Sequence, residues 1–493
     1  MKLGALAAAA GIALPAGPAG AEAAGINVTG FAIDNRKVAP GTVFGAFQGA
    51  TVNGEQFIPA AIAAGAVAVV ARPEASVAGA LHIADPQPRR LFARLAAPFY
   101  APFPETVVAV TGTNGKTSCV EMTRQLWRMA GHSAASIGTL GVTTPDGSQS
   151  TGLTTPDIVT FLANMAGLAR EGVTHVAYEA SSHGLSQYRS EGLRVAAGAF
   201  TNLSRDHLDY HSDMADYFAA KMRLFDEVVE EGGAAVLWAD DEWSAAAIGQ
   251  ARTRGLRLLT VGEKGDTIRL LARSPSQLGQ VLRLVHEGVE RTVNLPLIGA
   301  YQAANALVSA GLVIATGGDA GATFAALERL QPVRGRLERA AISAAGAPVY
   351  VDYAHTPDAL EAAIAALRPH VGSGGQGRLI VVFGAGGDRD SGKRPQMGRV
   401  AAAQADLAIV TDDNPRGEDP AEIRRAVLAG CPGAQEIADR RAAIAAAIGQ
   451  AGPDDIVLVA GKGHEQGQII GRGAEARVLP FDDVVVAREF ALS

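Results

Sequence analysis

Short apolar runs separated by helix-like stretches recur along most of the chain. Each run has the length and the continuous apolar character of a strand that is buried on both faces of a parallel sheet. In the middle of the chain the runs are 106–110, 175–179, 197–201 and 234–238. Towards the C-terminus the same alternation returns at 349–352, 378–383, 407–411 and 455–460. The pattern predicts an α/β protein with mostly parallel sheets, whose ligands bind at the carboxyl ends of the strands.

Proline-rich segments divide this pattern into three predicted domains. The segment Asp85-Pro86-Gln87-Pro88 closes a first region of short strands, and Leu330-Gln331-Pro332 marks a second boundary. A chain of 493 residues is also too long for a single core. We therefore expect a small α/β domain over 1–88, a central domain with a mostly parallel sheet over 89–333, and a doubly wound, Rossmann-like domain over 334–493.

The N-terminus loosely resembles a secretory signal, because Met1-Lys2 precedes an alanine-rich run that reaches Leu14. Alanine is only weakly hydrophobic, so we expect a helix packed on the first domain instead. The longest apolar stretch elsewhere, around 60–71, is too short to span a bilayer, and we expect no membrane insertion.

Composition narrows the class of partner. The net charge of −7 argues against nucleic acid as the main ligand. The two cysteines, Cys119 and Cys431, form neither a disulfide framework nor a metal-binding spacing, which suits a reducing cytoplasm.

The most informative motif is Thr-Gly-Thr-Asn-Gly-Lys-Thr-Ser at 111–118, between an apolar run and a helix-like stretch. In such a turn the backbone N–H groups face the phosphates of a nucleotide, the lysine neutralises their charge and the threonine hydroxyl reaches Mg²⁺. The strict phosphate-loop pattern would place a glycine at Val110, so this loop is a shortened variant. It predicts a central ATPase domain of the phosphate-loop type, with ATP bound by Gly112, Thr113, Asn114, Gly115, Lys116, Thr117 and Ser118.

Polar groups also follow two neighbouring runs. Glu179 ends one of them, and a carboxylate beside a phosphate loop is well placed to hold Mg²⁺. The next run leads into the motif 201–211, which is either a polar surface loop or a second metal or phosphate site. His207 and His211 are four residues apart, but Leu208 between them excludes the motif of zinc proteases.

Several single residues stay ambiguous from spacing alone. Lys221 falls on a helix-like segment, where a lysine is ordinarily solvated. Asn305 could bind a nucleotide base or cap a packing surface, and Asp352 could hold ribose hydroxyls at the end of a strand. The glycine-rich segment 383–389 mimics a dinucleotide fingerprint, but its third glycine is replaced by Arg389, which argues against NAD.

Two further strand ends in the third predicted domain carry Asp412-Asp413-Asn414-Pro415-Arg416 and Gly461-Lys462-Gly463-His464-Glu465. Together with Arg389 they bring guanidinium and carboxylate groups to one edge of one sheet. Arginines bind carboxylates in bidentate pairs and acids bind an ammonium, so this mixture favours a zwitterionic ligand such as an amino acid.

Taken together, these motifs resemble those of the Mur ligases of peptidoglycan synthesis, over nearly the whole chain. The motifs that carry the resemblance lie at 111–117, 179–185, 201–211, 352–355, 387–390, 413–416 and 461–465. The resemblance is greatest to the branch that adds a diamino acid to a UDP-muramoyl dipeptide. It implies an N-terminal domain that holds the UDP moiety, a central ATPase domain and a C-terminal domain that brings the amino acid.

The resemblance also implies an activity and its ligands. The expected reaction is ATP-dependent addition of meso-2,6-diaminopimelate to the D-Glu of UDP-N-acetylmuramoyl-L-Ala-D-Glu, through an acyl phosphate, with Mg²⁺ as cofactor. We expect a cytoplasmic enzyme that acts as a monomer. The runner-up functions are a folylpolyglutamate-synthetase-like ligase and the L-lysine-adding Mur ligase. A phosphate-loop GTPase or regulatory module is the alternative from another class.

Site residues follow from the same resemblance. It implies a carbamylated Lys221 (N6-carboxylysine) that acts with Lys116, Glu179 and His207 in catalysis, and Mg²⁺ ligands from Thr117, Glu179, His207 and the carbamate. Further ATP contacts are implied for Asn305, Arg336, Asp352 and His355. The UDP-muramoyl dipeptide is expected at Ile33, Asn35, Gln48, Thr154, Thr155, Ser181, Gln187 and Arg189, and diaminopimelate at Arg389, Asp413, Asn414, Pro415, Arg416, Gly461 and Glu465. The family usually has Asp-Ser-Arg where this chain has Asp34-Asn35-Arg36, and Asn35 retains a donor and an acceptor.

Overall fold

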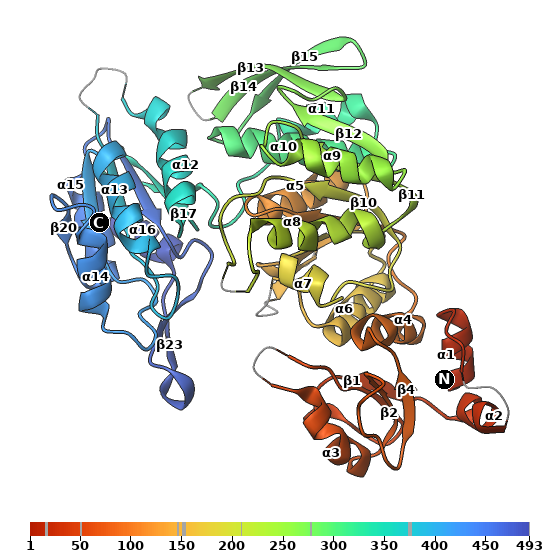
Figure 1. Cartoon of the computed structure of the whole chain (residues 1–493). Helices are drawn as coiled ribbons and strands as arrows, with labels where there is room; N and C mark the ends of the chain where they lie inside the picture. The colour runs from red at the N-terminus through yellow and green to blue at the C-terminus, as the bar shows by residue number, and fades with distance from the viewer. Residues whose placement is uncertain are drawn as a thin grey trace. The chain divides into compact units, whose positions relative to one another are not determined.

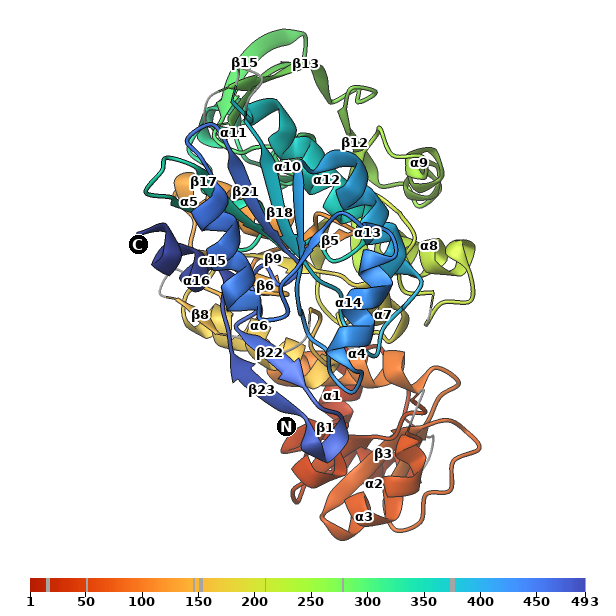
Figure 2. The same ribbon diagram turned by 90° about the vertical axis from the view of Figure 1, so that its left-hand side faces the viewer.

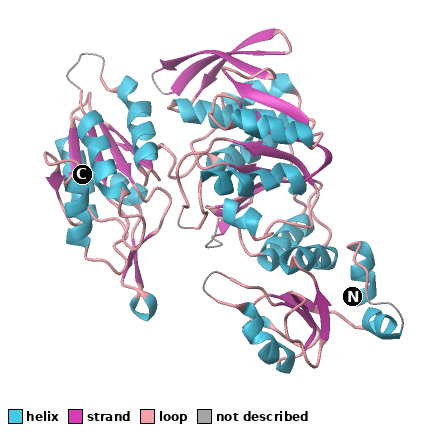
Figure 3. Cartoon of the chain, viewed as in Figure 1, coloured by secondary structure: helices cyan, strands magenta, loops and turns pink. Residues whose placement is uncertain are grey.

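The computed structural model describes residues 1–14, 18–49, 52–144, 147–149, 154–208, 210–276, 279–372 and 377–492. Strands and helices alternate along the chain, and most neighbouring strands are parallel, as the sequence predicts (Figures 1 and 3). Contacts divide the chain into two compact units: Met1–Asp266 with Val308–Ala320, and Thr267–Leu307 with Gly321–Ser493. The two domain boundaries expected from the sequence stay predictions.

The first unit begins with a parallel four-stranded sheet in the order β1-β2-β3-β4. Its elements are α1 (Leu3–Ala9), α2 (Pro18–Gly25), β1 (Gly30–Ala32), β2 (Thr42–Gly45), α3 (Ile58–Ala63), β3 (Ala66–Ala71), β4 (Leu81–Ala84) and α4 (Pro88–Tyr100). Leu3 and Leu6 of α1 belong to the same buried cluster as Phe31 and Phe92, whose rings meet edge to face at 5.5 Å. The predicted packing of an N-terminal helix on this region is confirmed.

The larger sheet of this unit contains β5 (Thr106–Thr111), β6 (Ala134–Gly138), β7 (Gly141–Thr143), β8 (Ser148–Gln149), β9 (His175–Glu179), β10 (Val195–Phe200), β11 (Val229–Trp238) and β12 (Arg257–Gly262). Its parallel strands run in the order β12-β11-β10-β5-β9-β6, so all four predicted strands are confirmed. Its helices are α5 (Lys116–Met129), α6 (Ile158–Arg170), α7 (Ser182–Ser186), α8 (Met214–Arg223) and α9 (Ser244–Thr253). Because β10, β5 and β9 are neighbours, the three polar motifs that follow them meet at one edge of the sheet.

The second unit is built on a sheet in the order β16-β17-β21-β18-β19-β20, parallel except for the β16-β17 pair (Figure 2). The strands are β16 (Glu338–Ile342), β17 (Pro348–Asp352), β18 (Leu379–Phe383), β19 (Leu407–Val410), β20 (Gln435–Glu436) and β21 (Ile456–Ala460). The helices are α12 (Pro357–Leu367), α13 (Lys393–Gln404), α14 (Pro420–Leu428), α15 (Arg440–Gln450) and α16 (Asp483–Ala491). The four strands that the sequence predicts here are confirmed.

Other elements were not predicted. The strands β13 (Ile268–Ser276), β14 (Gly279–His286) and β15 (Val289–Leu295) form antiparallel pairs, and β22 (Gly467–Ile470) and β23 (Arg477–Pro480) form a separate hairpin. Helices α10 (Ala300–Ala315) and α11 (Ala320–Leu327) follow β15. Strand β22 is mostly half-buried and β23 is exposed, and both are only four residues long, so this segment lacks the continuous apolar run of a fully buried strand. Across the described ranges, none of the helices is both long enough and apolar enough to cross a bilayer.

A fully buried ion pair joins α15 to the start of α16. The Arg440 guanidinium donates to both carboxylate oxygens of Asp483, at 2.8 and 2.7 Å, and neither side chain is exposed. The same guanidinium donates to the carbonyl oxygen of Ala460 at 3.0 Å, at the end of β21. Buried charges of this kind depend on each other, because a lone buried ion loses its hydration without compensation.

We expect Arg440→Met to lower the free energy of unfolding by about 3–5 kcal/mol, because it leaves the Asp483 carboxylate buried without its partner. The double variant Arg440→Met/Asp483→Leu should recover a large part of that loss, since it removes both charges. Urea denaturation of the three proteins measures the difference. A double variant as unstable as the single one would contradict this account.

Candidate functional site

The phosphate loop has the strand–turn–helix geometry that the sequence predicts. Strand β5 ends at Thr111, and Gly115 (φ 89°) caps the start of α5 in the left-handed conformation. The Lys116 ammonium folds back over the turn and donates to the carbonyl oxygens of Gly112 and Thr113, at 2.9 and 2.8 Å. The backbone N–H groups at the start of α5 therefore lie beside a fixed positive charge, which is the arrangement that binds phosphate.

The motif after β10 holds this loop in place. The Thr201 hydroxyl donates to the Asn114 carbonyl oxygen at 2.6 Å, and the Asn114 backbone N–H donates to the Asn202 side-chain oxygen at 2.9 Å. A side chain at Gly112 would bring its Cβ within 1.9 Å of the Thr201 hydroxyl oxygen, and φ there is 143°. Only glycine fits at this position. The sequence left open whether residues 201–211 form a polar surface loop or a second metal or phosphate site. The structure shows that the first two residues of this motif, Thr201 and Asn202, brace the phosphate loop.

Lys221 lies inside the protein, with a side chain 1% exposed, rather than in solvent. Its amine donates to the Gly112 carbonyl oxygen at 2.8 Å and lies 4.4 Å from the centre of the Tyr217 ring. Burial, and next the nearby Lys116 charge, hold the pKa of the Lys221 amine well below its usual value. The Asp206 carboxylate opposes this shift more weakly.

Glu179 is buried at the carboxyl end of β9. Its carboxylate accepts hydrogen bonds from the Thr139 backbone N–H at 2.7 Å and from the Thr139 hydroxyl at 3.2 Å. A Cβ at Gly138 would approach the Glu179 carboxylate oxygen to 2.2 Å, so Gly138 leaves the space that this carboxylate fills. Glu179 is therefore buried and does not lie at the solvated surface, where a lone glutamate is ordinarily found.

His207 is half-exposed and adopts the left-handed conformation, with φ 54°. Its ring lies 6.0 Å from that of Tyr217 and 5.1 Å from that of His183. Lys221 and His207 therefore flank the same tyrosine. The described residues contain no cluster of three or more histidine, cysteine, aspartate or glutamate side chains arranged to hold a metal. Mg²⁺, however, needs only one or two protein oxygens when phosphates and water complete its shell, so buried Thr117 and Glu179 fit it.

A second group of predicted residues meets beside Glu179. The Thr155 hydroxyl donates to the Glu179 carbonyl oxygen at 2.7 Å and lies 3.0 Å from the Ser181 hydroxyl. The Arg189 guanidinium donates to the Thr155 carbonyl oxygen at 3.0 Å and to the Gln187 side-chain oxygen at 2.8 Å. Thr154 joins the group through Thr139, with 3.1 Å between the two hydroxyls. The structure thus brings together the five residues predicted for the peptide end of the substrate.

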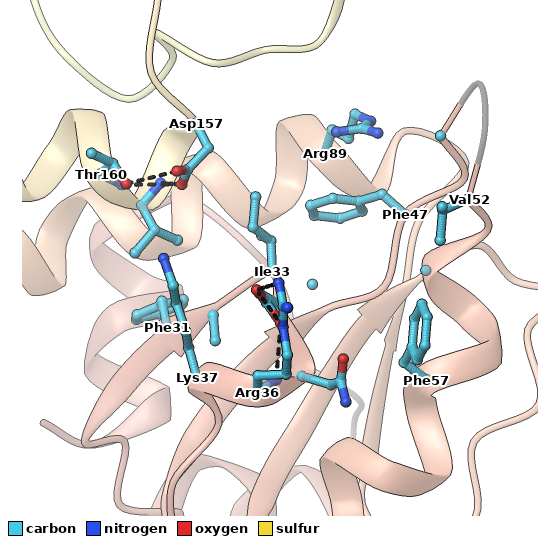
Figure 4. Close-up of a pocket in the computed structure, with 17 residues that line it drawn as sticks. Phe31, Ile33, Arg36, Lys37, Phe47, Val52, Phe57, Arg89, Asp157 and Thr160 are labelled. Atoms are coloured by element: carbon cyan, nitrogen blue, oxygen red, sulfur yellow. Dashed lines mark hydrogen bonds and ion pairs between the residues drawn. The ribbon is translucent and has the colours of Figure 1, made fainter. Parts of the chain in front are cut away.

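Two of the other three residues predicted for the UDP-muramoyl dipeptide lie at a cavity of about 710 Å³ (Figure 4). Ile33 and Asn35 line it, as predicted. Gln48 is not among its lining residues, but the Gln48 carbonyl oxygen accepts a hydrogen bond from the Arg89 guanidinium at 3.0 Å.

Sequence reasoning missed the groups that define this cavity. Arg89 lies 4.9 Å from the centre of the Phe47 ring, and both residues line the cavity with Phe31, Lys37 and Phe57. Aromatic faces and basic groups are well suited to a base and a diphosphate. These residues come from separate elements of the chain, so no local spacing in the sequence indicates that they meet.

The four remaining ATP predictions fall in the second unit. The buried Asp352 carboxylate accepts from the Leu337 backbone N–H at 2.7 Å, and burial raises its pKa to about 6 despite Arg336. Gln302 links two more of these residues, Arg336 and Asn305. It donates to the Arg336 carbonyl oxygen at 2.9 Å and accepts from the Asn305 amide at 3.4 Å. The His355 ring nitrogen is 2.8 Å from the carbonyl oxygen of Tyr353, over whose ring Arg336 lies at 4.6 Å.

The residues predicted for the amino acid also meet in the second unit. The Asn414 amide donates to the Glu465 carboxylate at 2.8 Å, and the Arg416 guanidinium donates to the Gly387 carbonyl oxygen at 2.9 Å. A Cβ built on Gly386 would lie 2.8 Å from the Arg416 guanidinium and 3.9 Å from the Arg389 side chain, so both arginines pack beside this glycine. At Gly461 (φ 122°) a Cβ would approach the Asp413 carboxylate to 2.9 Å. A Cβ at Gly387 would lie only 1.9 Å from the backbone carbonyl oxygen of Pro415, so this carbonyl packs still more closely on its glycine.

Sequence models of one protein family match three successive stretches of the chain. They are described as the Mur ligase family, catalytic domain, at residues 27–100; the Mur ligase middle domain at 110–313; and the Mur ligase, glutamate ligase domain at 335–463. Together these matches cover most of the chain, in the order that the sequence motifs follow.

Curated relatives match along nearly their whole length. A protein of Zymomonas mobilis is 62% identical over 465 residues, which is 94% of this chain and 95% of the relative. One of Bradyrhizobium diazoefficiens is 53% identical over 464 residues, covering 93% and 94%. Both are named UDP-N-acetylmuramoyl-L-alanyl-D-glutamate–2,6-diaminopimelate ligase.

Solved structures agree with the sequence matches. A structure of a ligase of the same name has a TM-score of 0.69 and 33% identity, and the match covers 94% of both chains. Folylpolyglutamate synthase of Mycobacterium tuberculosis, complexed with ADP, has a TM-score of 0.62 at 19% identity and covers only 76% of this chain. The latter shows a shared fold alone. With three successive family matches and full-length relatives, the chain belongs to the Mur ligase family.

Proposed function

We propose that this chain is the ATP-dependent ligase that joins meso-2,6-diaminopimelate to the D-Glu of UDP-N-acetylmuramoyl-L-Ala-D-Glu, in cytoplasmic synthesis of peptidoglycan precursors. The observation that carries the proposal is that one chain has both a phosphate loop and a cluster of Arg416, Arg389 and Glu465. The first suits activation by ATP, and the second suits an amino acid. The names of the full-length relatives support the identity of both substrates.

The reaction needs activation, because a carboxylate is a poor electrophile. The γ-phosphoryl group of ATP passes to an oxygen of the D-Glu side-chain carboxylate, which gives an acyl phosphate and releases ADP. The neutral amine of the amino acid then attacks the acyl carbon and loses a proton. The bond between that carbon and the phosphate oxygen breaks, and inorganic phosphate leaves. Lys116 and the N–H groups at the start of α5 stabilise the negative charge of the transferring group.

The remaining residues bind and orient the substrates. Thr117, Glu179, His207 and a carbamate on Lys221 are the proposed ligands of Mg²⁺, which would supply positive charge to offset that of the phosphates. Arg189 and its neighbours Thr154, Thr155, Ser181 and Gln187 would hold the dipeptide. Asp352 can accept from ribose hydroxyls, and Asn305, Arg336 and His355 complete the proposed nucleotide contacts.

Two alternatives predict different behaviour. A folylpolyglutamate-type ligase does not bind a UDP-sugar, so it would not need the cavity at Ile33 and Asn35. The folylpolyglutamate synthase structure also matches only 76% of this chain, whereas the structure of the diaminopimelate ligase matches 94% of it. A phosphate-loop GTPase or regulatory module would hydrolyse its nucleotide without an acceptor. The decisive assay is phosphate release from ATP with each substrate omitted in turn. Strict dependence on both the UDP-muramoyl dipeptide and a diamino acid supports the ligase, and substrate-independent turnover contradicts it.

Lys116→Ala should abolish ligation while the protein stays folded, because this lysine contacts loop carbonyls and no apolar core. We expect turnover to fall by roughly a thousandfold or more, the scale seen when a charge that stabilises phosphoryl transfer is removed. Lys264→Ala, at an exposed position, is the matched control. Circular dichroism and thermal melting establish folding. An active Lys116→Ala protein would remove the phosphate loop from the mechanism.

Lys221 should carry a carbamate. Its amine adds to CO₂ and loses a proton, which places a carboxylate on a long arm beside the phosphate loop. Lys221→Ala should be nearly inactive and should recover part of its activity when a short carboxylic acid fills the space. Lys264→Ala should show no response to the acid. Intact mass measured under CO₂ checks the modification directly, and full activity of Lys221→Ala would contradict it.

Arg416 should read the second carboxylate of the amino acid. L-Lysine lacks that carboxylate, so a lysine substrate leaves the guanidinium without a charged partner, a loss of roughly 2–5 kcal/mol. That corresponds to a preference for meso-diaminopimelate of about a hundredfold or more in kcat/KM. The ratio of kcat/KM for the two amino acids, in wild type and in Arg416→Ala, measures this. Equal use of lysine by the wild type, or an unchanged ratio in the variant, would show that another group sets the selectivity.

A further inference from the structure

A buried lysine that the mechanism does not use lies beneath the proposed amino-acid site. The Lys462 side chain is wholly inaccessible to solvent. Its ammonium donates to the side-chain oxygen of Asn414 at 2.7 Å and to the carbonyl oxygen of Gly467 at 2.8 Å. The carboxylates of Asp413 and Glu465 lie 3.4 and 3.7 Å away. One positive charge thus joins the loop after β19, the loop after β21 and the start of β22.

This contact fixes the orientation of a side chain in the site. The Asn414 oxygen accepts from Lys462 and also from the Ile469 backbone N–H at 2.9 Å. The Asn414 amide nitrogen must then face the other way, where it donates to the Glu465 carboxylate at 2.8 Å. A flipped amide would set its N–H₂ group against two donors. Lys462 therefore determines how Asn414 presents its donor to Glu465.

The hairpin β22–β23 holds the neighbouring Arg416 by its backbone. The Arg416 N–H donates to the Ile469 carbonyl oxygen at 3.0 Å, and the Gly471 N–H donates to the Arg416 carbonyl oxygen at 2.7 Å. Arg416 has φ 50°, a left-handed conformation that a non-glycine residue keeps only when its surroundings impose it. The Gln468 side chain adds a hydrogen bond to the Asp413 carbonyl oxygen at 2.7 Å.

The same hairpin reaches the loop that carries the second arginine. Arg472, which follows β22, forms an ion pair with Asp388, and the Gly417 N–H donates to the other oxygen of that carboxylate at 3.1 Å. Asp388 directly precedes Arg389 in the chain. Both guanidinium groups of the proposed site are thus attached, through their own loops, to one short hairpin, which extends beyond the parallel sheet in Figure 2.

We propose that Lys462 and Gln468 are positioning residues, and that they set the arrangement of Arg416, Arg389 and Glu465 through the hairpin β22–β23. An amino acid with two charged ends is selected by the separation of the groups that bind those ends, so a support that fixes the separation fixes selectivity. The identity of the amino acid in this inference rests on the proposed function. The positioning role of Lys462 and Gln468 rests on the hydrogen bonds and ion pairs described above.

The test uses Lys462→Met and Gln468→Met in the full-length protein, because methionine matches the length of glutamine, is one atom shorter than lysine, and cannot donate. We expect KM for meso-diaminopimelate to rise about tenfold or more, with kcat within about threefold and KM for ATP within about twofold of wild type. The preference for meso-diaminopimelate over L-lysine should fall by a similar factor. Gln468→Met, at a half-buried position, keeps the test open if Lys462→Met does not fold.

Arg378→Met is the matched control. It removes an ion pair with Asp455, at 2.7 Å, at the opposite end of the same sheet. We expect it to reduce stability without changing the KM for the amino acid. Kinetic constants that shift together in all three variants would show that Lys462 and Gln468 act on stability alone, and would overturn the proposal.

Hydrogen exchange measured without substrates separates this inference from the proposed function. Amides of Asp413, Asn414 and Arg416 and of residues 467–471 should exchange about tenfold faster or more in Lys462→Met and Gln468→Met, and at the wild-type rate in Arg378→Met. If the wild type prefers another amino acid, the proposed acceptor is wrong. The KM for that amino acid then takes the place of the KM for meso-diaminopimelate in the comparison of the variants. Unchanged exchange in both segments would overturn the positioning role whatever the acceptor is.

Discussion

Two lysine side chains donate to the same backbone oxygen, and the chemistry of the first unit depends on this contact. Lys116 and Lys221 reach the Gly112 carbonyl oxygen at 2.9 and 2.8 Å. Two ammonium groups this close repel each other, and burial adds to the cost of charging Lys221. A neutral amine at Lys221 relieves both penalties, and the neutral form is also the one that reacts with CO₂. A carbamate there would turn the repulsion into an attraction between Lys116 and its neighbour.

The contact exists because three adjacent strands end together. Strand β5 supplies the phosphate loop, β9 ends in Glu179, and β10 leads into Thr201 and Asn202. Parallel strands with continuous apolar sequences have a strong signal, since both of their faces are buried, and their polar ends are conspicuous for the same reason. The sequence therefore correctly predicts the strands, the strand–turn–helix geometry of the loop and the place of Glu179 at a strand end, while the role of Glu179 stays a prediction. It does not reveal that the motif after β10 braces the loop, because that depends on which strands become neighbours.

The residues that sequence reasoning missed share a different property. Arg89 reaches the cavity of the first unit from α4, and its partner Phe47 follows β2, so their proximity is set by tertiary packing. The hairpin β22–β23 carries Gln468 on a short, largely exposed pair of strands without an apolar alternation. Positions such as Ile33 and Asn35 followed only from resemblance to the family. Long-range proximity of this kind has no signature in local spacing.

The two buried lysines show why burial alone does not assign a role. Lys221 and Lys462 are both almost inaccessible, and burial lowers the pKa of both amines. Around Lys462 the carboxylates of Asp413 and Glu465 oppose that shift, and two oxygen acceptors hold its ammonium in one place. Lys221 has one carbonyl acceptor and an aromatic face, and the like charge of Lys116 outweighs the opposing Asp206 carboxylate. The first environment favours a fixed cation that organises its neighbours, and the second favours an amine that is open to chemical modification. The partners of each buried lysine therefore decide whether it supports a site or takes part in one.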